Sequence, residues 1–289
     1  MVTGALGAAA VGLLGYGFAR TTNPAAATVV TGVLQSRARR ADSGWVVVYP
    51  PGIDPTRPVL PAGGRVPVVV ALHGYGSDQT VLQRLALDVA LGAATAAGAA
   101  PFALAAIAGG DTYWHPRRDG TDAAAMVTEE FLPALAEHGL AAGPQYQVGL
   151  LGWSMGGYGA LRLAELLGPG RVRAVAAASP ALWRAPGDTP AGAFDDAEDY
   201  HHNDVFAHRS ALKGISVRID CGLGDPFLVA TRSFVSGVQP PPAGGFGPGG
   251  HDDAYWATLA VPQIAFLGSA LAGTSLHPNP SPSAQPSST

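Results

Sequence analysis

Cysteine and lysine are almost absent from this chain of 289 residues. Cys221 is the only cysteine, so no disulfide can form within the chain, and cysteine usage leaves the redox compartment open. Lys213 is the only lysine, and the formal net charge is -4. This composition has no basic footprint for the phosphates of nucleic acids, so we expect no nucleic-acid partner.

A metal-binding pattern is missing as well. The residues that could in principle ligate a metal are His201, His202, Asp204 and His208. Their spacing matches none of the common metal sites, so we expect no metal ion. The sequence implies no organic cofactor either.

Charge is missing from the first 19 residues, Met1–Ala19, and Arg20 ends this run. Ala25–Ala27 follows and offers small side chains for a cleavage site, as in a secretory signal. No positive residue precedes the apolar stretch, and its glycines keep it weakly hydrophobic, which suits a twin-arginine type of signal. It is also about long enough to span a bilayer. We therefore predict a signal peptide or N-terminal anchor over residues 1–27, with export or association with the cell envelope.

Apolar runs and helix-like stretches alternate over residues 28–272, without repeats or a domain linker. The expected strands are Val29–Gln35, Trp45–Tyr49, Val66–Leu72, Phe102–Ile107, Tyr146–Leu151, Val172–Ala177 and Ile215–Asp220. The expected helices are Gln79–Ala97 with Asp78 as N-cap, Asp122–His138 broken late by Pro133, Gly157–Leu167, Asp225–Val235 and Ala254–Leu271.

This alternation predicts an α/β fold with one doubly wound, mostly parallel sheet and helices on both faces. Val66–Leu72 is apolar throughout, which is typical of a central strand buried on both faces. We expect an irregular excursion over Ser179–Arg209 and a Pro/Gly-rich loop over Val238–Gly250. Residues 273–289 are rich in proline and serine and read as a disordered tail.

A G-x-S-x-G motif, Gly152–Gly156, lies between the apolar run Tyr146–Leu151 and the helix-like stretch Gly157–Leu167. A serine hydroxyl becomes a useful nucleophile only if the backbone projects it toward both a base and an oxyanion site. A tight turn does this with strained backbone angles, and its neighbours must be small so that strand and helix can approach. The motif therefore predicts the nucleophile elbow of an α/β-hydrolase, with Ser154 as the nucleophile.

The base must come from a histidine that follows the nucleophile. In this fold the acid and then the histidine follow the serine along the chain, in loops at the carboxyl ends of strands. The candidates after Ser154 are His201, His202, His208, His251 and His277. His277 lies in the polar tail, and the first three lie in the excursion, too early for this order. His251 precedes the last helix, so we predict it as the base.

The acid that orients the base is predicted to be Asp225. It follows a strand that ends near Asp220, where a carboxylate can accept the Nδ1–H of the imidazole and fix its tautomer. Asp220 is still on the strand, and we expect it to support the loop by hydrogen bonds. Asp252 and Asp253 are too close to the base in sequence for the usual geometry.

Two backbone N–H groups should bind the oxyanion. One comes from the residue after the nucleophile, Met155, and the other from the loop after the Val66–Leu72 strand, where Tyr75 is our choice and Gly74 and Gly76 are alternatives. His73 in the same loop is expected to be a buried hydrogen-bonding residue.

Three aromatic residues adjoin these motifs. Trp153, Trp114 and Tyr113 are candidates for lining the substrate pocket, and the alternative is that they belong to the apolar core.

At these motifs the chain resembles the esterase D-like branch of the α/β-hydrolases. This branch contains S-formylglutathione hydrolases, feruloyl and acetyl esterases, and the mycobacterial mycolyltransferase antigens. Gly152–Leu161 resembles the family's elbow, and Ile219–Leu228 its acid loop, where Asp225 stands at the position of the triad acid. Gly249–His251, followed by Tyr255–Trp256, resembles its histidine loop.

The resemblance implies a serine esterase with a Ser-His-Asp triad. Met155-Gly156 and an aspartate acid are typical of the plain esterases, because the mycolyltransferases usually have Ser-Met-Ala and a glutamate. The family usually has a strand between acid and histidine, where this chain has the Pro/Gly-rich segment Val238–Gly250. The leader and the alanine-rich composition resemble those of exported actinobacterial esterases.

These observations predict hydrolysis of a small-molecule or lipid ester through an acyl-enzyme. An acyltransferase of the mycolyltransferase type, in which an alcohol or sugar replaces water, would need the same residues, because the two differ in acceptor binding and water exclusion. A non-catalytic envelope protein would be expected to lack a triad member, and none is missing. A serine peptidase is compatible with the triad, but no substrate-gating domain is evident.

Overall fold

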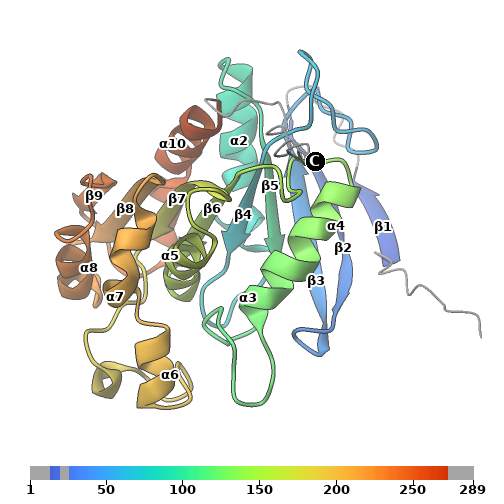
Figure 1. Ribbon diagram of the computed structural model, residues 1–289. Coiled ribbons are helices and arrows are strands. Elements are labelled where there is room, and N and C mark those ends of the chain that lie inside the picture. Colours follow the sequence, from blue (N-terminus) through green and yellow to red (C-terminus); the bar gives the residue numbers. More distant parts are fainter. Residues whose placement is uncertain (1–13, 20–25, 273–289) are drawn as a thin grey trace, which may run out of the picture.

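A computed structural model describes residues 14–19 and 26–272 of the chain (Figure 1). Within these residues one sheet of nine strands has the order β1-β2-β3-β5-β4-β6-β7-β8-β9. Its strands are β1 (Leu14–Ala19), β2 (Thr28–Ser36), β3 (Ala41–Tyr49), β4 (Val68–Leu72), β5 (Ala103–Ile107), β6 (Val148–Trp153), β7 (Val172–Ala178), β8 (Ser216–Gly222) and β9 (Ala243–Gly247).

The sheet changes character at β5. Neighbouring strands are antiparallel from β1 through β2 and β3 to β5, whereas from β5 through β4 to β9 all neighbouring strands are parallel. The chain passes from β4 to β5 on one side and then to β6 on the other side, so its winding reverses at β4 and β6. Ligands bind open sheets beyond the carboxyl ends of strands at such a reversal. The predicted doubly wound, mostly parallel sheet is confirmed.

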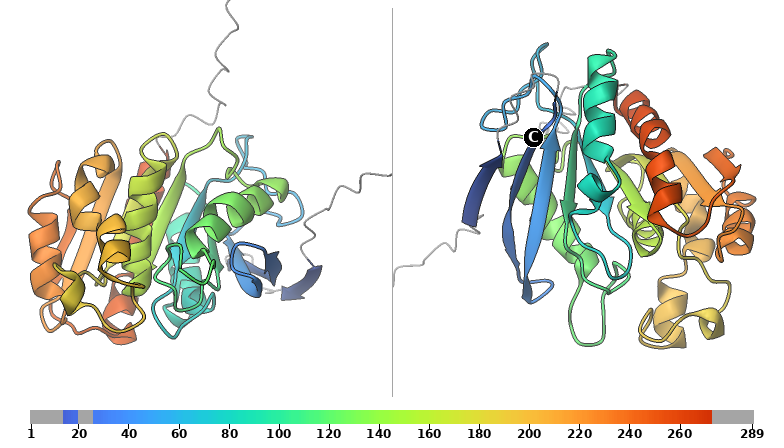
Figure 2. Two further views of the ribbon diagram at one scale, coloured as in Figure 1. Left: turned by 60° about the horizontal axis from the view of Figure 1, so that its bottom comes forward. Right: turned by 180° about the vertical axis from the view of Figure 1, so that it is seen from behind.

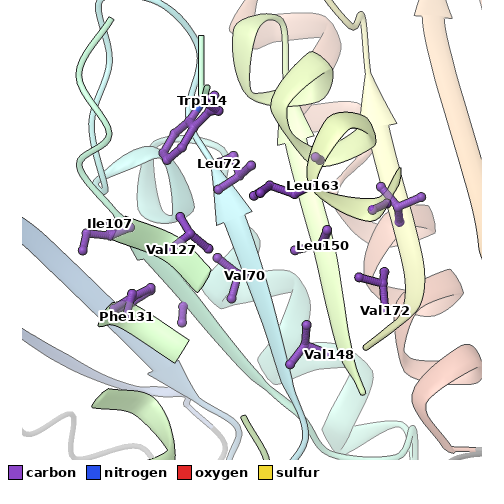
Figure 3. Packing of buried hydrophobic residues seen from close by; sticks show 14 of the residues in the cluster. Val70, Leu72, Ile107, Trp114, Val127, Phe131, Val148, Leu150, Leu163 and Val172 are labelled. Atoms are coloured by element: carbon purple, nitrogen blue, oxygen red, sulfur yellow. The ribbon is translucent and has the colours of Figure 1, made fainter. Parts of the chain in front are cut away.

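Alternate residues of the central strands face two apolar layers. In β4, Val70 and Leu72 join one buried cluster and Val69 and Ala71 the other, as the period of two in a strand requires. Figure 3 shows the first cluster, where Val70 and Leu72 lie near residues of β6 and of the helices.

Helices cover both layers (Figure 2). Over the first lie α3 (Ala123–Ala125), the π-helical turn η1 (Met126–Phe131), α4 (Leu132–Glu137), α5 (Met155–Leu167) and α8 (Leu228–Val235). Over the second lie α1 (Val81–Arg84), α2 (Leu87–Ala96), α9 (Asp253–Thr258) and α10 (Ala260–Ala272). Burial of apolar side chains on both faces stabilises the sheet at about 25 cal/mol per Å².

The single helix predicted from Gln79 to Ala97 is wrong, because it is split into α1 and α2. Ala86 separates them with a left-handed φ of 55°. Asp78 does not cap a helix: its Oδ1 accepts hydrogen bonds from the main-chain N–H and the hydroxyl of Thr80, at 2.8 and 2.6 Å. Such a local turn competes with a helix start, so the helix begins later.

Pro133 does not break its helix. The helical path continues from α3 through η1 to α4, and Asp122 caps its start by accepting the Ala125 N–H. Proline lacks an N–H and crowds the carbonyl four residues earlier. The wider π turn of η1 ends at Phe131, two residues before Pro133, and contains Glu129, the residue whose carbonyl the proline ring would crowd in a regular α-helix.

The segment predicted as a Pro/Gly-rich loop contains the strand β9. It pairs in parallel with β8, with Cys221 opposite Phe246 and Gly222 opposite Gly247. Three of its five residues are glycine, so pairing with β8, rather than side-chain pattern, defines it as a strand at the sheet edge.

The excursion between β7 and β8 contains four short helices joined by irregular segments, and two of these helices pack against α5. The four helices are η2 (Pro186–Asp188), α6 (Ala197–His202), α7 (Val205–His208) and η3 (Arg209–Leu212). The hydroxyl of Tyr158 on α5 donates to the Asn203 carbonyl at 2.9 Å, and Arg162 donates to the His202 carbonyl at 3.2 Å.

The predicted leader and tail lie mostly outside the described residues. Residues 1–13 and 20–25 of the leader are not described, and Leu14–Ala19 between them pairs with β2 as β1. The predicted tail, 273–289, is also outside the described range. In the described part of the chain, no helix has the length and apolar character needed to cross a membrane.

The first turn of α5 packs directly on the end of β4. A methyl group on Gly156 would overlap the Leu72 carbonyl oxygen, a backbone atom that cannot move aside alone. We expect Gly156→Ala to lower the free energy of unfolding by more than about 3 kcal/mol or to prevent soluble expression. Gly170→Ala is the control, because nothing lies within 4 Å of its added methyl group. Urea unfolding would measure both, and equal stability of the two variants would contradict this packing.

Glu165 on α5 is buried, and neither carboxyl oxygen has a hydrogen-bond partner among the described residues. Burial raises the pKa of this carboxyl to about 9, which Arg162 opposes only in part. In the unfolded chain a glutamate titrates near pH 4.3. Between about pH 4.3 and 9 the folded protein therefore binds more protons than the unfolded chain, so the free energy of unfolding falls as pH rises.

Glu165→Gln keeps the shape and removes the titration. We expect the variant to gain stability relative to the wild type as pH rises from 5 to 8, on the order of 1–3 kcal/mol. Thermal unfolding at both pH values would measure this, with Glu129→Gln, an exposed carboxyl of η1, as the matched control. A Glu165→Gln difference that does not change with pH would show that Glu165 folds in its ionised form.

Candidate active site

Ser154 lies at the junction of β6 and α5 with a left-handed φ of 55° and a ψ of -119°. A non-glycine residue in this conformation costs on the order of 1–3 kcal/mol. The turn is held by its backbone, since the Ser154 N–H donates to Ala178 at 3.0 Å and its carbonyl accepts from Tyr158 and Ala181. A methyl group on Gly152 would overlap the Gly156 carbonyl, so the flanking residues must be small, as the motif predicts. The turn therefore projects the hydroxyl away from the sheet.

Ser154, His251 and Asp225 form a continuous hydrogen-bonded row. His251 Nε2 lies 2.8 Å from Ser154 Oγ, and His251 Nδ1 lies 2.8 Å from Asp225 Oδ2. A carboxylate only accepts hydrogen bonds, so Nδ1 carries the ring proton and Nε2 accepts from the serine hydroxyl. The three residues come from the ends of β6 and β8 and from the loop after β9, and they meet as the sequence predicts.

The Asp225 side chain is fully buried. Burial alone would raise the pKa of its carboxyl, but the pKa is held below the usual value by the hydrogen bond from His251, the nearby Ser179 hydroxyl and the Phe227 N–H, which donates to Oδ1 at 2.8 Å. The carboxyl is therefore a carboxylate at neutral pH. A buried anion beside the imidazole favours the protonated ring that forms when Nε2 takes up a proton.

Two aromatic rings fix the plane of His251, and the sequence motifs did not single them out for this role. The Phe227 ring centre lies 5.2 Å from that of His251, and the Trp256 ring lies 5.0 Å away, edge-on to the imidazole. Both rings follow the motif residues closely in sequence, Phe227 two residues after the acid and Trp256 five residues after the base. This closeness in sequence to the acid and the base is the signal that could have identified both rings as neighbours of His251.

The other candidate acids have separate partners. Asp220 forms an ion pair with Arg218 at 2.7 Å, and burial raises the pKa of its carboxyl. Asp252 caps α9 by accepting the Tyr255 N–H at 2.9 Å, and Asp253 pairs with Arg84.

The excursion histidines lie apart from the serine. His208 Nδ1 bonds the Asp204 carbonyl within α7, at 2.9 Å. Within the part of the chain that the structure describes, no group of three or more His, Cys, Asp or Glu side chains could hold a metal ion.

The loop after β4 lies against the nucleophile. A methyl group built on Gly74 would be 3.4 Å from Ser154 Cβ, so the backbone at Gly74–Tyr75 borders the hydroxyl. Met155 is the first residue of α5, where an N–H has no acceptor within the helix. In the described chain the Tyr75 N–H has no hydrogen-bond partner either.

An open cleft of about 500 Å³ contains Ser154 and His251. Its lining is mixed, with a polar side formed by Ser77, Asp78, Thr80 and Arg84 beside Gly74, Tyr75, Gly76 and Trp256. Tyr75 is 65% exposed, so its ring stands at the rim. A substrate therefore meets polar groups on one side of the nucleophile.

Trp153 and Trp114 do not line this cleft, and the expectation that they form the substrate pocket is wrong. Trp153 ends β6 and is 1% exposed within the second apolar layer, whereas Trp114 is fully buried in the first layer. The Trp114 ring fills the space left by the missing side chains of Gly109 and Gly159. Both residues are in the core because strand alternation and glycine gaps direct their rings inward.

Tyr113 belongs to a chain of rings beside the site rather than to the cleft lining. The centre of its ring lies 6.3 Å from that of Tyr75 and 5.6 Å from that of Trp183. The ring centres of Trp183 and Phe227 are 5.4 Å apart. Because Phe227 touches His251, the rings form an aromatic arc, Tyr75–Tyr113–Trp183–Phe227, from the oxyanion loop to the base. Trp183 comes from the excursion, where no sequence motif marks it.

The sheet order, the strained serine between β6 and α5, and the acid and histidine loops define an α/β-hydrolase. Over residues 46–236 the sequence matches the model of the Esterase family ("Putative esterase"), and the chain belongs to this family. It is a carboxylic ester hydrolase. The family match includes Ser154 and Asp225 and ends before His251. No curated protein sequence matches the chain.

Solved structures similar to this chain share its fold. A ferulic acid esterase superposes with a TM-score of 0.71 at 20% identity, covering 85% of this chain and 99% of the esterase. An S-formylglutathione hydrolase from Agrobacterium tumefaciens gives 0.67 at 16% identity, with 90% and 99% covered. Mycobacterium tuberculosis MPT51 (FbpC1) gives 0.59 at 16% identity, with 82% and 96% covered.

Proposed function

We propose that the protein hydrolyses carboxylic esters through a Ser154-His251-Asp225 triad and an acyl-enzyme. The observation that carries the proposal is the row of two 2.8 Å hydrogen bonds that joins the three side chains. Such a row lets one imidazole take a proton from the serine while a carboxylate stabilises the resulting charge. No step needs a metal ion or an organic cofactor.

In the first half-reaction the Ser154 oxygen attacks the ester carbonyl, and His251 Nε2 accepts the hydroxyl proton. The carbonyl electrons move onto the oxygen, where the N–H groups of Met155 and Tyr75 stabilise the negative charge. When the tetrahedral intermediate collapses, the bond to the alcohol breaks and His251 gives its proton to the departing oxygen. Water then attacks the acyl-enzyme by the same steps, with His251 as its base.

The substrate class is a small-molecule or lipid ester that reaches the serine from solvent. The cleft is open, and its polar side at Ser77–Arg84 fits a polar part of the substrate, while the rings of Tyr75 and Trp256 in the cleft lining fit an apolar part. Export to the cell envelope belongs to the same proposal, on the basis of the charge-free start of the sequence. Fractionation of cells that produce the full chain would test it, and recovery only in the cytosol would contradict it.

Replacing the nucleophile tests the triad most directly. We expect Ser154→Ala to lower kcat for p-nitrophenyl acetate and butyrate by about 10⁴-fold or more, because the acyl-enzyme can no longer form. The full chain and the variant would be compared at equal concentration of folded protein. An unchanged rate in the variant would remove Ser154 from the mechanism.

Product analysis in the same assay, with an added alcohol or sugar such as trehalose, separates hydrolysis from acyl transfer. Free acid as the main product supports the hydrolase, and an acylated alcohol or sugar supports the acyltransferase.

Asp225→Asn tests the acid. The amide would present a donor to Nδ1 and favour the wrong imidazole tautomer, so we expect kcat to fall by about 10³–10⁴-fold. Asp252→Asn is the matched control, because asparagine also caps helices and the residue follows His251 directly. A large loss in Asp252→Asn with normal activity in Asp225→Asn would reassign the acid.

A further inference from the structure

His73 lies at the end of β4, fully buried, and belongs neither to the hydrogen-bonded row nor to the cleft lining. It bridges the loops after two neighbouring strands. The Gly109 N–H, after β5, donates to Nε2 at 2.8 Å, and Nδ1 lies 2.8 Å from the Gly74 carbonyl oxygen, after β4. Trp114 holds the residue from behind, since its indole N–H donates to the His73 carbonyl at 3.3 Å and its ring packs edge-on to the imidazole.

These contacts allow a single form of the ring. A carbonyl oxygen only accepts hydrogen bonds, so Nδ1 must carry the proton, and Nε2 must be unprotonated to accept the Gly109 N–H. Burial lowers the pKa of His73, although Asp78 and Asp111 oppose the effect, so the ring is neutral. A neutral ring with both nitrogens engaged is a fixed connector rather than a base.

The hydrogen bond from His73 Nδ1 determines the direction of the Gly74–Tyr75 peptide. The Gly74 carbonyl accepts from His73 Nδ1 and, at 3.2 Å, from the Ser77 N–H. In a planar trans peptide the N–H points opposite to the C=O. The Tyr75 N–H, in the same peptide plane, therefore points away from these two donors. Asp111 secures the next peptide by accepting the Gly76 N–H at 2.7 Å.

We propose that His73 is the positioning residue of the oxyanion site: its Nδ1–H holds the Gly74–Tyr75 peptide so that the Tyr75 N–H faces the oxygen of the reacting carbonyl. The proposal rests on the proposed esterase function. The nearness of Gly74 to Ser154 Cβ places this peptide beside the reacting atoms. A donor that is fixed before the reaction stabilises developing charge without reorganising, so the effect belongs in kcat rather than in KM.

Two variants of similar shape separate positioning of the Gly74–Tyr75 peptide from a merely structural role of His73. His73→Asn keeps a donor where Nδ1 stands and loses the Nε2 acceptor, whereas His73→Gln keeps an acceptor near Nε2 and loses the donor. We expect His73→Asn to retain kcat for p-nitrophenyl acetate within about threefold. We expect His73→Gln and His73→Ala to lose about 10²–10³-fold in kcat, the effect of losing one oxyanion donor, with little change in KM.

Affinity for phenylboronic acid provides a second readout. The boronate forms a tetrahedral adduct with serine and places an oxygen at the oxyanion site, so its affinity should fall with kcat in His73→Gln but not in His73→Asn. Equal loss of kcat in both variants, or normal kcat in His73→Gln, would overturn the proposal. If the variants do not fold, ¹⁵N NMR of the wild-type imidazole decides, because a proton on Nε2 instead of Nδ1 would also overturn it.

The Ser154→Ala assay distinguishes a failure of the proposed esterase function from a failure of the proposed role of His73. If Ser154→Ala remains active, the proposed function itself is wrong. If Ser154→Ala is inactive while the His73 variants fail to differ as stated, the esterase mechanism stands and only the role of His73 is wrong.

Discussion

The contact between the first turn of α5 and the end of β4 is the constraint on which the site depends. Gly156 lies so close to the Leu72 carbonyl that no side chain fits between them. With strand and helix this close, the connecting residue, Ser154, must take a left-handed φ and project its hydroxyl outward. The same contact brings the loop after β4 beside the nucleophile. One backbone contact thus sets both the position of the hydroxyl and its distance from the Tyr75 N–H.

The base depends on a second backbone device, at the edge of the sheet. The acid loop is tied to the histidine loop, since the Leu223 N–H donates to Gly247 at 2.8 Å and the Gly224 N–H to Gly249 at 2.9 Å. β9 therefore does more than extend the sheet, because it fixes the start of the loop that carries His251. Glycine at the end of β8 suits this close approach, as a methyl group on Gly222 would overlap the Gly249 carbonyl in the loop after β9. Two segments far apart in sequence act as one support for the imidazole.

The sequence predicts the parts of this molecule whose cause is local. The elbow around Ser154 and the alternation of strands and helices follow from short-range patterns, and both were found. The order of acid and histidine limited the candidates to residues that do meet in space. The strand β9 was missed because glycines carry no side-chain period. Trp114 and Trp153 were left open between substrate pocket and core, because an aromatic residue beside a motif does not reveal which face it occupies. Trp183 was missed because only tertiary folding of the excursion brings it near the site.

The distribution of tryptophan makes the intrinsic fluorescence of the protein sensitive to the surroundings of the site. Four of its five tryptophans, Trp45, Trp114, Trp153 and Trp256, are at most 9% exposed, while Trp183 is only partly buried and stands in the aromatic arc beside His251. An indole that water reaches emits at longer wavelength than a buried one. The long-wavelength side of the tryptophan emission should therefore come mainly from Trp183, and its blue shift during turnover would record the displacement of water from the arc by an acyl or alcohol group.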